Sequence, residues 1–143
     1  KFSRQLSHKW RSKEHAILIG GQPFEIDKPI LNARNWDSND PIRFILTKNK
    51  KIYNKNFQII SKKKYLTVSE INDILFEKNI QSIIIEGGKK TLDMFINSDC
   101  WDEARVIVSE NKLKTGTTSP VLNLKPNSEV IIDGDTIQFH FNQ

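Results

Sequence analysis

The sequence predicts an α/β domain whose mainly parallel central sheet is flanked by helices. Three observations support this fold class. Short, continuous apolar runs at residues 15–21 and 82–85 are typical of strands that are covered on both faces. Residues 89–97 carry apolar side chains at helical spacing. An Asp133-Gly134 pair between two β-rich runs predicts a C-terminal antiparallel hairpin, which we expect at an edge of the sheet.

The first elements follow from apolar spacing. A helix is predicted over residues 3–14, because Leu6 and Trp10 lie four positions apart on one face. Residues 15–21 follow as a buried strand that runs into a pair of glycines. Residues 22–40 are rich in proline, asparagine and aspartate, so we expect turns there.

The middle of the chain predicts two short strands and a helix. The strands are expected at residues 42–46 and 57–61. Thr67 and Glu70 are three residues apart and predict a capping box at the start of the helix. We expect this helix to end at Asn79. Its apolar stripe consists of Ile71, Ile74 and Leu75.

In the last part of the chain, the predicted elements are a strand, a helix and three further strands. The strand at residues 82–85 ends in a tight turn, Glu86-Gly87-Gly88. The remaining predicted elements are a helix at residues 89–97 and strands at residues 106–108, 130–132 and 136–141.

The composition indicates one globular domain over residues 1–143. Hydrophobic residues make up 37% of the chain and charged residues 27%, a mixture that excludes a wholly disordered chain. No apolar run approaches the roughly 20 residues that span a bilayer. The single cysteine, Cys100, excludes a disulfide framework and a cysteine-based zinc site. We therefore expect no metal and a cytoplasmic location.

The formal net charge of +5 is accompanied by a lysine-rich stretch at residues 48–64. A basic protein can prefer nucleic acid or phosphorylated ligands. The stretch contains Tyr53 and Phe57 but no recognisable RNA-binding motif. We interpret it as a solvated loop and strand edge, and nucleic-acid binding is the alternative.

The glycine turn after residues 82–85 is a candidate phosphate site. Two glycines let the backbone approach a ligand closely, and the free N–H groups of a helix start favour an anion. Thr91 would add a hydroxyl group, and Lys89 or Lys90 a charge. The turn matches neither a Rossmann fingerprint nor a P-loop, so a plain turn is an equally good interpretation.

Two further candidates are charged. Glu86 ends a buried strand, where a carboxylate should be ion-paired or should touch a ligand. Asp27 and Arg34 lie in one loop after the first strand, and Arg34 would suit a bidentate grip on a phosphate. A structural turn at Asp27 and a solvated Arg34 remain the alternative.

Taken in order, five segments resemble one family. They are residues 3–11, 15–20, 27–34, 41–43 and 85–88, which read SRQLSHKWR, HAILIG, DKPILNAR, PIR and IEGG. The family is the reductase domain of the bifunctional riboflavin biosynthesis deaminase–reductase. The resemblance implies a dihydrofolate-reductase-like fold, a homodimer, and reduction of 5-amino-6-(5-phosphoribosylamino)uracil to its ribitylamino form by NADPH.

The resemblance also implies site residues. Catalytic roles fall on Asp27 and Glu86. Substrate contacts fall on Arg11, Leu31, Arg34 and Glu86. Cofactor contacts fall on Asp27, Gly88, Lys89, Lys90, Thr91, Leu92, Asp93 and Met94.

Three departures from the family accompany the resemblance. Pro23 and Thr47 stand where the family commonly has Thr and Asp. The family's opening strand would lie upstream of Lys1, so we expect an N-terminally incomplete domain whose fused deaminase half is absent and which can be inactive alone. Other interpretations are a reductase of the same fold with another substrate, and a non-catalytic module for nucleotide binding or dimerisation.

Overall fold

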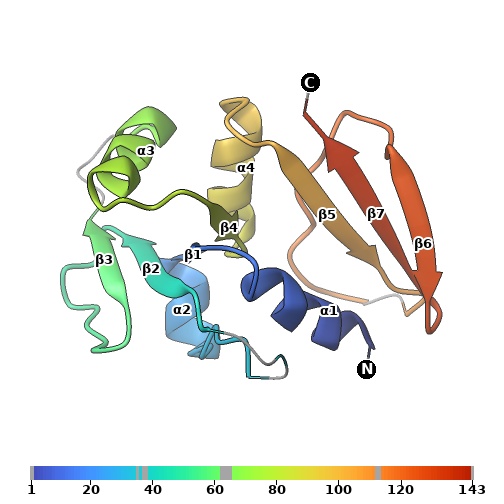
Figure 1. Cartoon of the computed structure of the whole chain (residues 1–143), viewed down its shortest axis with the longest axis horizontal. Helices are drawn as coiled ribbons and strands as arrows, with labels where there is room; N and C mark the ends of the chain where they lie inside the picture. Colours follow the sequence, from blue (N-terminus) through green and yellow to red (C-terminus); the bar gives the residue numbers. More distant parts are fainter. Residues whose placement is uncertain (1, 35, 37–38, 62–65, 112–113, 143) are drawn as a thin grey trace.

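The computed structural model describes residues 2–34, 36, 39–61, 66–111 and 114–142. Four helices and seven strands are present in this part of the chain. They follow one another as α1 (Phe2–Arg11), β1 (Ala16–Gly20), α2 (Gly21–Asp27), β2 (Ile42–Thr47), β3 (Gln58–Ser61), α3 (Val68–Glu77), β4 (Ile83–Ile85), α4 (Lys89–Asn97), β5 (Glu103–Val108), β6 (Ser128–Ile132) and β7 (Asp135–Phe141) (Figure 1).

The parallel sheet has the strand order β3-β2-β1-β4, and each neighbouring pair is parallel. All four carboxyl ends therefore meet at one edge, where ligands bind in open α/β sheets. All five residues of β1 are buried, as its continuous apolar run predicts. The predicted α/β class with a mainly parallel sheet is confirmed.

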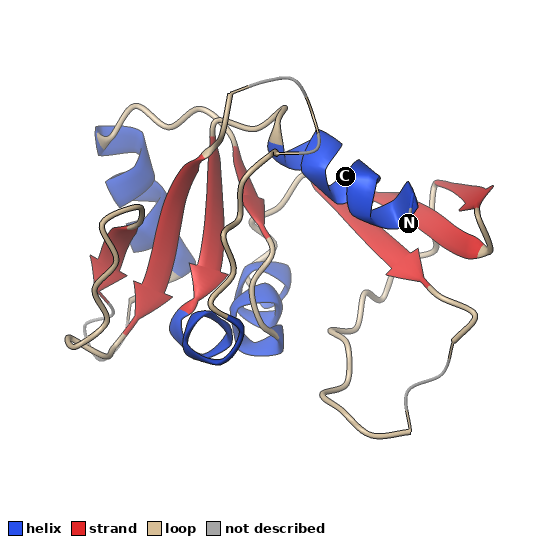
Figure 2. Ribbon diagram, turned by 90° about the horizontal axis from the view of Figure 1, so that it is seen from below, coloured by secondary structure: helices blue, strands red, loops and turns tan. Residues whose placement is uncertain are grey.

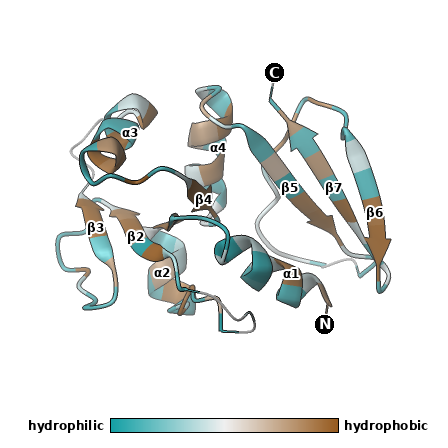
Figure 3. Ribbon diagram, viewed as in Figure 1, coloured by the Kyte–Doolittle hydropathy of each residue, from teal (hydrophilic) through white to brown (hydrophobic). Residues whose placement is uncertain are grey.

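Helices cover both faces of the parallel sheet (Figure 1). On one face, Leu18 and Phe44 pack with residues of α3 and α4, including Ile71 and Phe95. On the other face, α2 contributes Phe24 to a second core cluster. Figure 3 shows apolar residues concentrated on the strands of this sheet, whereas α1 is largely hydrophilic. None of the described helices is both long and apolar enough to cross a lipid bilayer.

The antiparallel strands form a sheet of their own, in the order β5-β7-β6. Asp133 and Gly134 both have positive φ, 53° and 85°, as a two-residue hairpin turn of type I′ requires. The predicted hairpin is confirmed, but its place at an edge of the parallel sheet is not. Figure 2 shows the second sheet set apart, with α1 running along it.

One predicted loop contains a helix. The region expected to form turns begins with α2, which starts directly after β1. Pro23 sits in the first turn, where its missing N–H costs no helical hydrogen bond, and Phe24 is buried in the core. The helix ends at Lys28, whose φ of 43° is left-handed. Burial of one aromatic side chain therefore outweighs the turn-forming composition.

Candidate active site

Two helices begin side by side at the carboxyl edge of the parallel sheet. α2 follows β1 and α4 follows β4, and neither helix start has a side-chain cap. At α4, the N–H groups of Thr91 and Leu92 donate to the carbonyl oxygen of Gly88. The N–H groups of Lys89 and Lys90 have no partner among the described residues. Fewer N–H groups are therefore free to bind an anion at this turn than the N–H groups of residues 88–92 that were expected to do so.

Glycines allow the two helix starts to touch. Gly88 has a φ of 57°, and a Cβ atom there would lie 2.5 Å from Cγ of Pro23. A Cβ atom on Gly20 would lie 2.7 Å from Oγ1 of Thr91. Two positively polarised helix starts in contact form a site that favours an anion. Pro23 contributes its ring to this contact, in place of the hydroxyl group that is common in the family.

The side chains of α4 divide between surface and core. Nζ of Lys89 lies 2.9 Å from Oδ2 of Asp93, so this ion pair occupies both groups. Lys90 is exposed and forms no ion pair with the described residues. Met94 packs against the core cluster under α3 and α4, together with Phe95. Met94 is only partly buried, and the cofactor contact implied for it stays a prediction.

Glu86 is paired with Arg11. Nε and Nη2 of Arg11 donate to the two carboxylate oxygens of Glu86 over 2.7 and 2.6 Å, a bidentate ion pair. The side chains are only 16% and 23% exposed. Nη1 of Arg11 also donates to the carbonyl oxygen of Asn32 over 3.3 Å. Glu86 therefore balances the charge of Arg11 within the protein, and the substrate contact implied for Arg11 stays a prediction.

Arg11, Leu31 and Arg34, three of the substrate contacts that the resemblance implies, line one hollow. Its volume is about 360 Å³, and α1 and the loop after α2 form its walls. The lining residues are Arg4, Ser7, His8, Arg11, Lys28, Pro29, Ile30, Leu31, Asn32 and Arg34. Arg4, Lys28 and Arg34 form no ion pair with any described residue. The hollow is therefore cationic.

Leu31 and Asp27 have different surroundings. Leu31 has a φ of 53°, which is rare for a leucine, and its side chain is buried in the core beside Phe24. Its backbone is thus held in a strained conformation at the edge of the hollow. Asp27 ends α2, is exposed, and lines neither this hollow nor the one beside Tyr53. Among the described residues, no hydrogen bond or ion pair joins Asp27 to Glu86, and the catalytic roles implied for them stay predictions.

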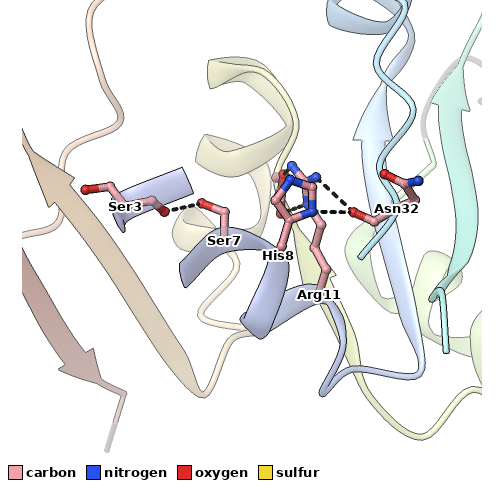
Figure 4. A network of polar contacts seen from close by, with 6 residues as sticks. Ser3, Ser7, His8, Arg11 and Asn32 are labelled. Atoms are coloured by element: carbon pink, nitrogen blue, oxygen red, sulfur yellow. Dashed lines mark hydrogen bonds and ion pairs between the residues drawn. The ribbon is translucent and has the colours of Figure 1, made fainter. Parts of the chain in front are cut away.

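Arg4, His8 and Asn32 are among the residues of the hollow that were not predicted as site residues. His8 is 2% exposed, and its Nδ1 atom lies 2.8 Å from the carbonyl oxygen of Asn32 (Figure 4). The available signal was the spacing of Arg4, His8 and Arg11, which places them on one face of a helix. A polar stripe of this kind is usually solvated, and only the packing of α1 shows that it faces a hollow.

A second, more open hollow lies between α2 and the loop after β2. It has a volume of about 580 Å³ and is lined by Phe24, Glu25, Lys28, Asn49, Lys51, Ile52, Tyr53 and Asn54. Part of the lysine-rich stretch is thus a solvated loop, as expected, with Tyr53 84% exposed. Residues 62–64 of that stretch lie outside the described part of the chain.

Cys100 is exposed and carries no disulfide. Within the described ranges, no group of three or more histidine, cysteine or acidic residues is arranged to hold a metal ion.

A family model described as the RibD C-terminal domain matches residues 1–110 of this chain. Among curated protein sequences, none matches. Solved structures share the fold at low identity. A Thermotoga maritima diaminohydroxyphosphoribosylaminopyrimidine deaminase/5-amino-6-(5-phosphoribosylamino)uracil reductase is 18% identical with a TM-score of 0.83, and the match covers 100% of this chain and 49% of that one.

Two single-function enzymes are also similar. The Saccharomyces cerevisiae riboflavin biosynthesis reductase Rib7 is 16% identical with a TM-score of 0.75, over 96% of this chain and 78% of that one. An Enterococcus faecalis dihydrofolate reductase, solved as a complex with NADP(H), is 15% identical with a TM-score of 0.64, over 94% of this chain and 79% of that one. These likenesses show the fold. The chain spans about half the length of the Thermotoga protein.

Proposed function

Because the chain belongs to the RibD C-terminal domain family, we propose that it reduces 5-amino-6-(5-phosphoribosylamino)uracil with NADPH in riboflavin biosynthesis. As the ribose ring opens, the ring oxygen takes the proton of the linking nitrogen and an imine is left. Hydride then adds to the anomeric carbon, and a proton from solvent adds to the nitrogen. The product carries a ribityl chain with its phosphate unchanged.

The observation that carries this proposal is the cationic hollow between α1 and the loop after α2. Arg4, Lys28 and Arg34 give it positive charge that no described carboxylate balances. A substrate phosphate would supply the missing anion. The planar guanidinium of Arg34 suits the phosphate oxygens better than an ammonium group would. A phosphorylated substrate therefore fits this hollow.

The cofactor proposal rests on the turn before α4. The residues present fit a phosphate group of a dinucleotide, because the N–H groups of Lys89 and Lys90 have no partner among the described residues. NADPH supplies the hydride when bound. Thr91 is buried against Gly20 and so helps to shape the turn. Cofactor contacts from Asp27, from Asp93 and from the other α4 residues that the resemblance implies stay predictions.

Arg11 and Glu86 have a positioning role in this scheme. Three of the five N–H groups of Arg11 are held by Glu86 and Asn32, which leaves two for a ligand. Because both partners are fixed, these two donors lie in a defined direction before the substrate arrives. Preorganised donors of this kind bind without a further cost of ordering the side chain.

A direct test compares two substrates. The protein is incubated with NADPH and either the phosphorylated substrate or its dephosphorylated analogue, and loss of NADPH absorbance is followed. We expect turnover of the phosphorylated compound, and at least a tenfold lower kcat/KM for the analogue, as loss of a charge-assisted contact implies. Equal rates, or turnover of dihydrofolate alone, would favour a reductase of the same fold with another substrate.

The other parts of the proposal are a homodimer, a cytoplasmic location and a deaminase domain encoded in the same polypeptide. The last is supported by the Thermotoga deaminase/reductase, of which this chain matches 49%.

A further inference from the structure

The loop after α2 carries two of the implied substrate contacts on a strained backbone. Leu31 and Arg34 line the cationic hollow, yet residues 28–33 belong to neither a helix nor a strand. Lys28 has a φ of 43° and Leu31 a φ of 53°, in a left-handed region that residues other than glycine rarely adopt. Such a backbone persists only where its surroundings hold it in place. The groups that hold this loop therefore determine where its side chains lie.

From one side, α1 holds the loop at a single carbonyl group. Nδ1 of His8 lies 2.8 Å from the carbonyl oxygen of Asn32, and Nη1 of Arg11 donates to the same oxygen over 3.3 Å (Figure 4). A carbonyl oxygen can only accept, so Nδ1 of His8 carries the hydrogen of its bond. His8 is almost fully buried, which keeps water from competing for this donor. Because Asn32 directly follows the strained Leu31, both bonds fix the backbone where it turns.

From the other side, residues at the start of β2 hold two further backbone groups. Oδ1 of Asp40 accepts from the N–H group of Ala33 over 2.9 Å. Nη1 of Arg43 donates to the carbonyl oxygen of Ile30 over 3.2 Å. Side chains thus supply the hydrogen-bond partners that regular secondary structure would supply elsewhere.

Anchors on both sides order the loop before a ligand arrives. Arg11 is itself fixed by Glu86, and it shares the carbonyl oxygen of Asn32 with His8. The position of the loop is therefore tied to the bidentate ion pair. A loop that is already ordered binds a ligand at a lower free-energy cost than one that must first be ordered. Loss of an anchor should therefore weaken substrate binding even where the anchor does not touch the substrate.

We infer that His8 and Asp40 are positioning residues, which hold the strained loop from opposite sides in the conformation that binds substrate. The inference rests on the proposed function, since it takes Leu31 and Arg34 as substrate contacts. Removing either anchor raises KM for the substrate and leaves kcat nearly unchanged, because the loop binds substrate and transition state alike.

Steady-state kinetics on paired variants test the role of His8. His8→Leu removes the donor to the carbonyl oxygen of Asn32, whereas His8→Asn keeps an N–H group as many bonds from the backbone as Nδ1. For His8→Leu we expect KM for the phosphorylated substrate to rise about fivefold, with kcat and the Kd of NADPH within about twofold. His8→Asn should return KM to within about twofold of the unmodified protein. His15→Leu, outside the hollow, is the matched control and should change none of these values.

Asp40 offers an independent pair of variants at a more exposed position. Asp40→Ala removes the acceptor for the N–H group of Ala33, and Asp40→Asn keeps Oδ1 but loses the charge. The side chain of Asp40 is 42% exposed, so both variants should fold, and they decide the matter if His8→Leu does not. We expect KM to rise about threefold in Asp40→Ala and to stay within about twofold in Asp40→Asn.

The outcomes separate the inference from the proposed function. If the unmodified protein does not reduce the substrate, both fail. If it does, an unchanged KM in folded His8→Leu or in Asp40→Ala overturns the inference alone. An equal rise of KM in the conservative variants His8→Asn and Asp40→Asn also overturns it, as does an equal loss of NADPH affinity, because either result would indicate a general loss of structure.

Discussion

Glu86 and Arg11 are 75 residues apart in the sequence, yet they form the bidentate ion pair at the centre of the site. The position of Glu86 after a buried strand predicts that its carboxylate has a partner. That the partner is Arg11 could not be predicted, because it depends on how α1 packs against the end of β4. The same holds for His8, whose burial follows from tertiary packing and not from local spacing.

Replacing Glu86 by glutamine tests this pair at the residue scale. The change leaves the half-buried Arg11 without a counter-charge, so we expect the free energy of unfolding to fall by about 1–2 kcal/mol. Asp93→Asn removes the more exposed pair with Lys89 within α4 and should cost at most about 0.5 kcal/mol. Urea unfolding followed by circular dichroism measures both. Equal losses would show that the Arg11 pair is no more important than an ordinary surface pair.

At the scale of elements, local patterns predict most helices and strands. The capping box at Thr67 and Glu70 is present, and α4 has the predicted bounds. Both signals are local: a cap needs one turn of chain, and amphipathic spacing needs two or three. α2 was not predicted, because its seven residues are too few for a periodic pattern and a proline lies in its first turn. Its stability comes from the burial of Phe24 against the sheet.

The turn before α4 is predicted to depend on Gly88. Alanine at this position would be forced into a φ of 57° and would press on Pro23, so we expect a loss of about 2–4 kcal/mol in the free energy of unfolding. NADPH affinity should fall as well, because the helix start must shift. Gly134→Ala is the matched control, since that φ is also positive but its neighbours are no closer than 3.6 Å.

For Gly134→Ala we expect about 1 kcal/mol of destabilisation from backbone strain and unchanged NADPH affinity. Fluorescence titration with NADPH and thermal unfolding separate the two effects. If Gly88→Ala binds NADPH as tightly as the unmodified protein, the glycine turn is not part of the cofactor site.

At the scale of the whole molecule, α1 connects the two sheets. On one side it holds Glu86 through Arg11. On the other side Trp10 packs edge-on against Phe139 of β7, with ring centroids 6.4 Å apart, and the guanidinium of Arg105 lies 5.2 Å from the Trp10 ring. The sequence predicts the strands but not that β5, β6 and β7 form a sheet of their own, because periodicity within a strand carries no information on which distant strand it joins.

Acid should weaken the contact between α1 and the antiparallel sheet. Hydrogen bonds from Arg105 hold the pKa of Glu103 below its ordinary value, and hydrogen bonds from the Ser3 and Ser109 hydroxyls lower the pKa of Asp135. A carboxylate whose pKa is lowered by folding stabilises the folded protein at pH values above its unfolded-state pKa, which is about 4.3 for Glu. This stability is lost as the pH falls through the folded-state pKa.

We therefore expect the melting temperature to fall as the pH drops from about 5 to 3. Glu103→Gln should be less stable than the unmodified protein at pH 7 and should lose less on acidification. Thermal unfolding at a series of pH values measures this. If the melting temperature of the variant falls with pH as steeply as that of the unmodified protein, Glu103 does not contribute to the sensitivity to acid.

Arg34→Lys provides the most direct test of the claim that the hollow holds the phosphate of the substrate and that the cofactor binds elsewhere. Lysine keeps the charge but loses the planar, bidentate fork. Titration of the variant with the phosphorylated substrate should give a Kd roughly tenfold higher, and titration with NADPH should give a Kd within about twofold of the unmodified protein. An equal loss of affinity for both ligands, or an unchanged Kd for the substrate, would contradict the account.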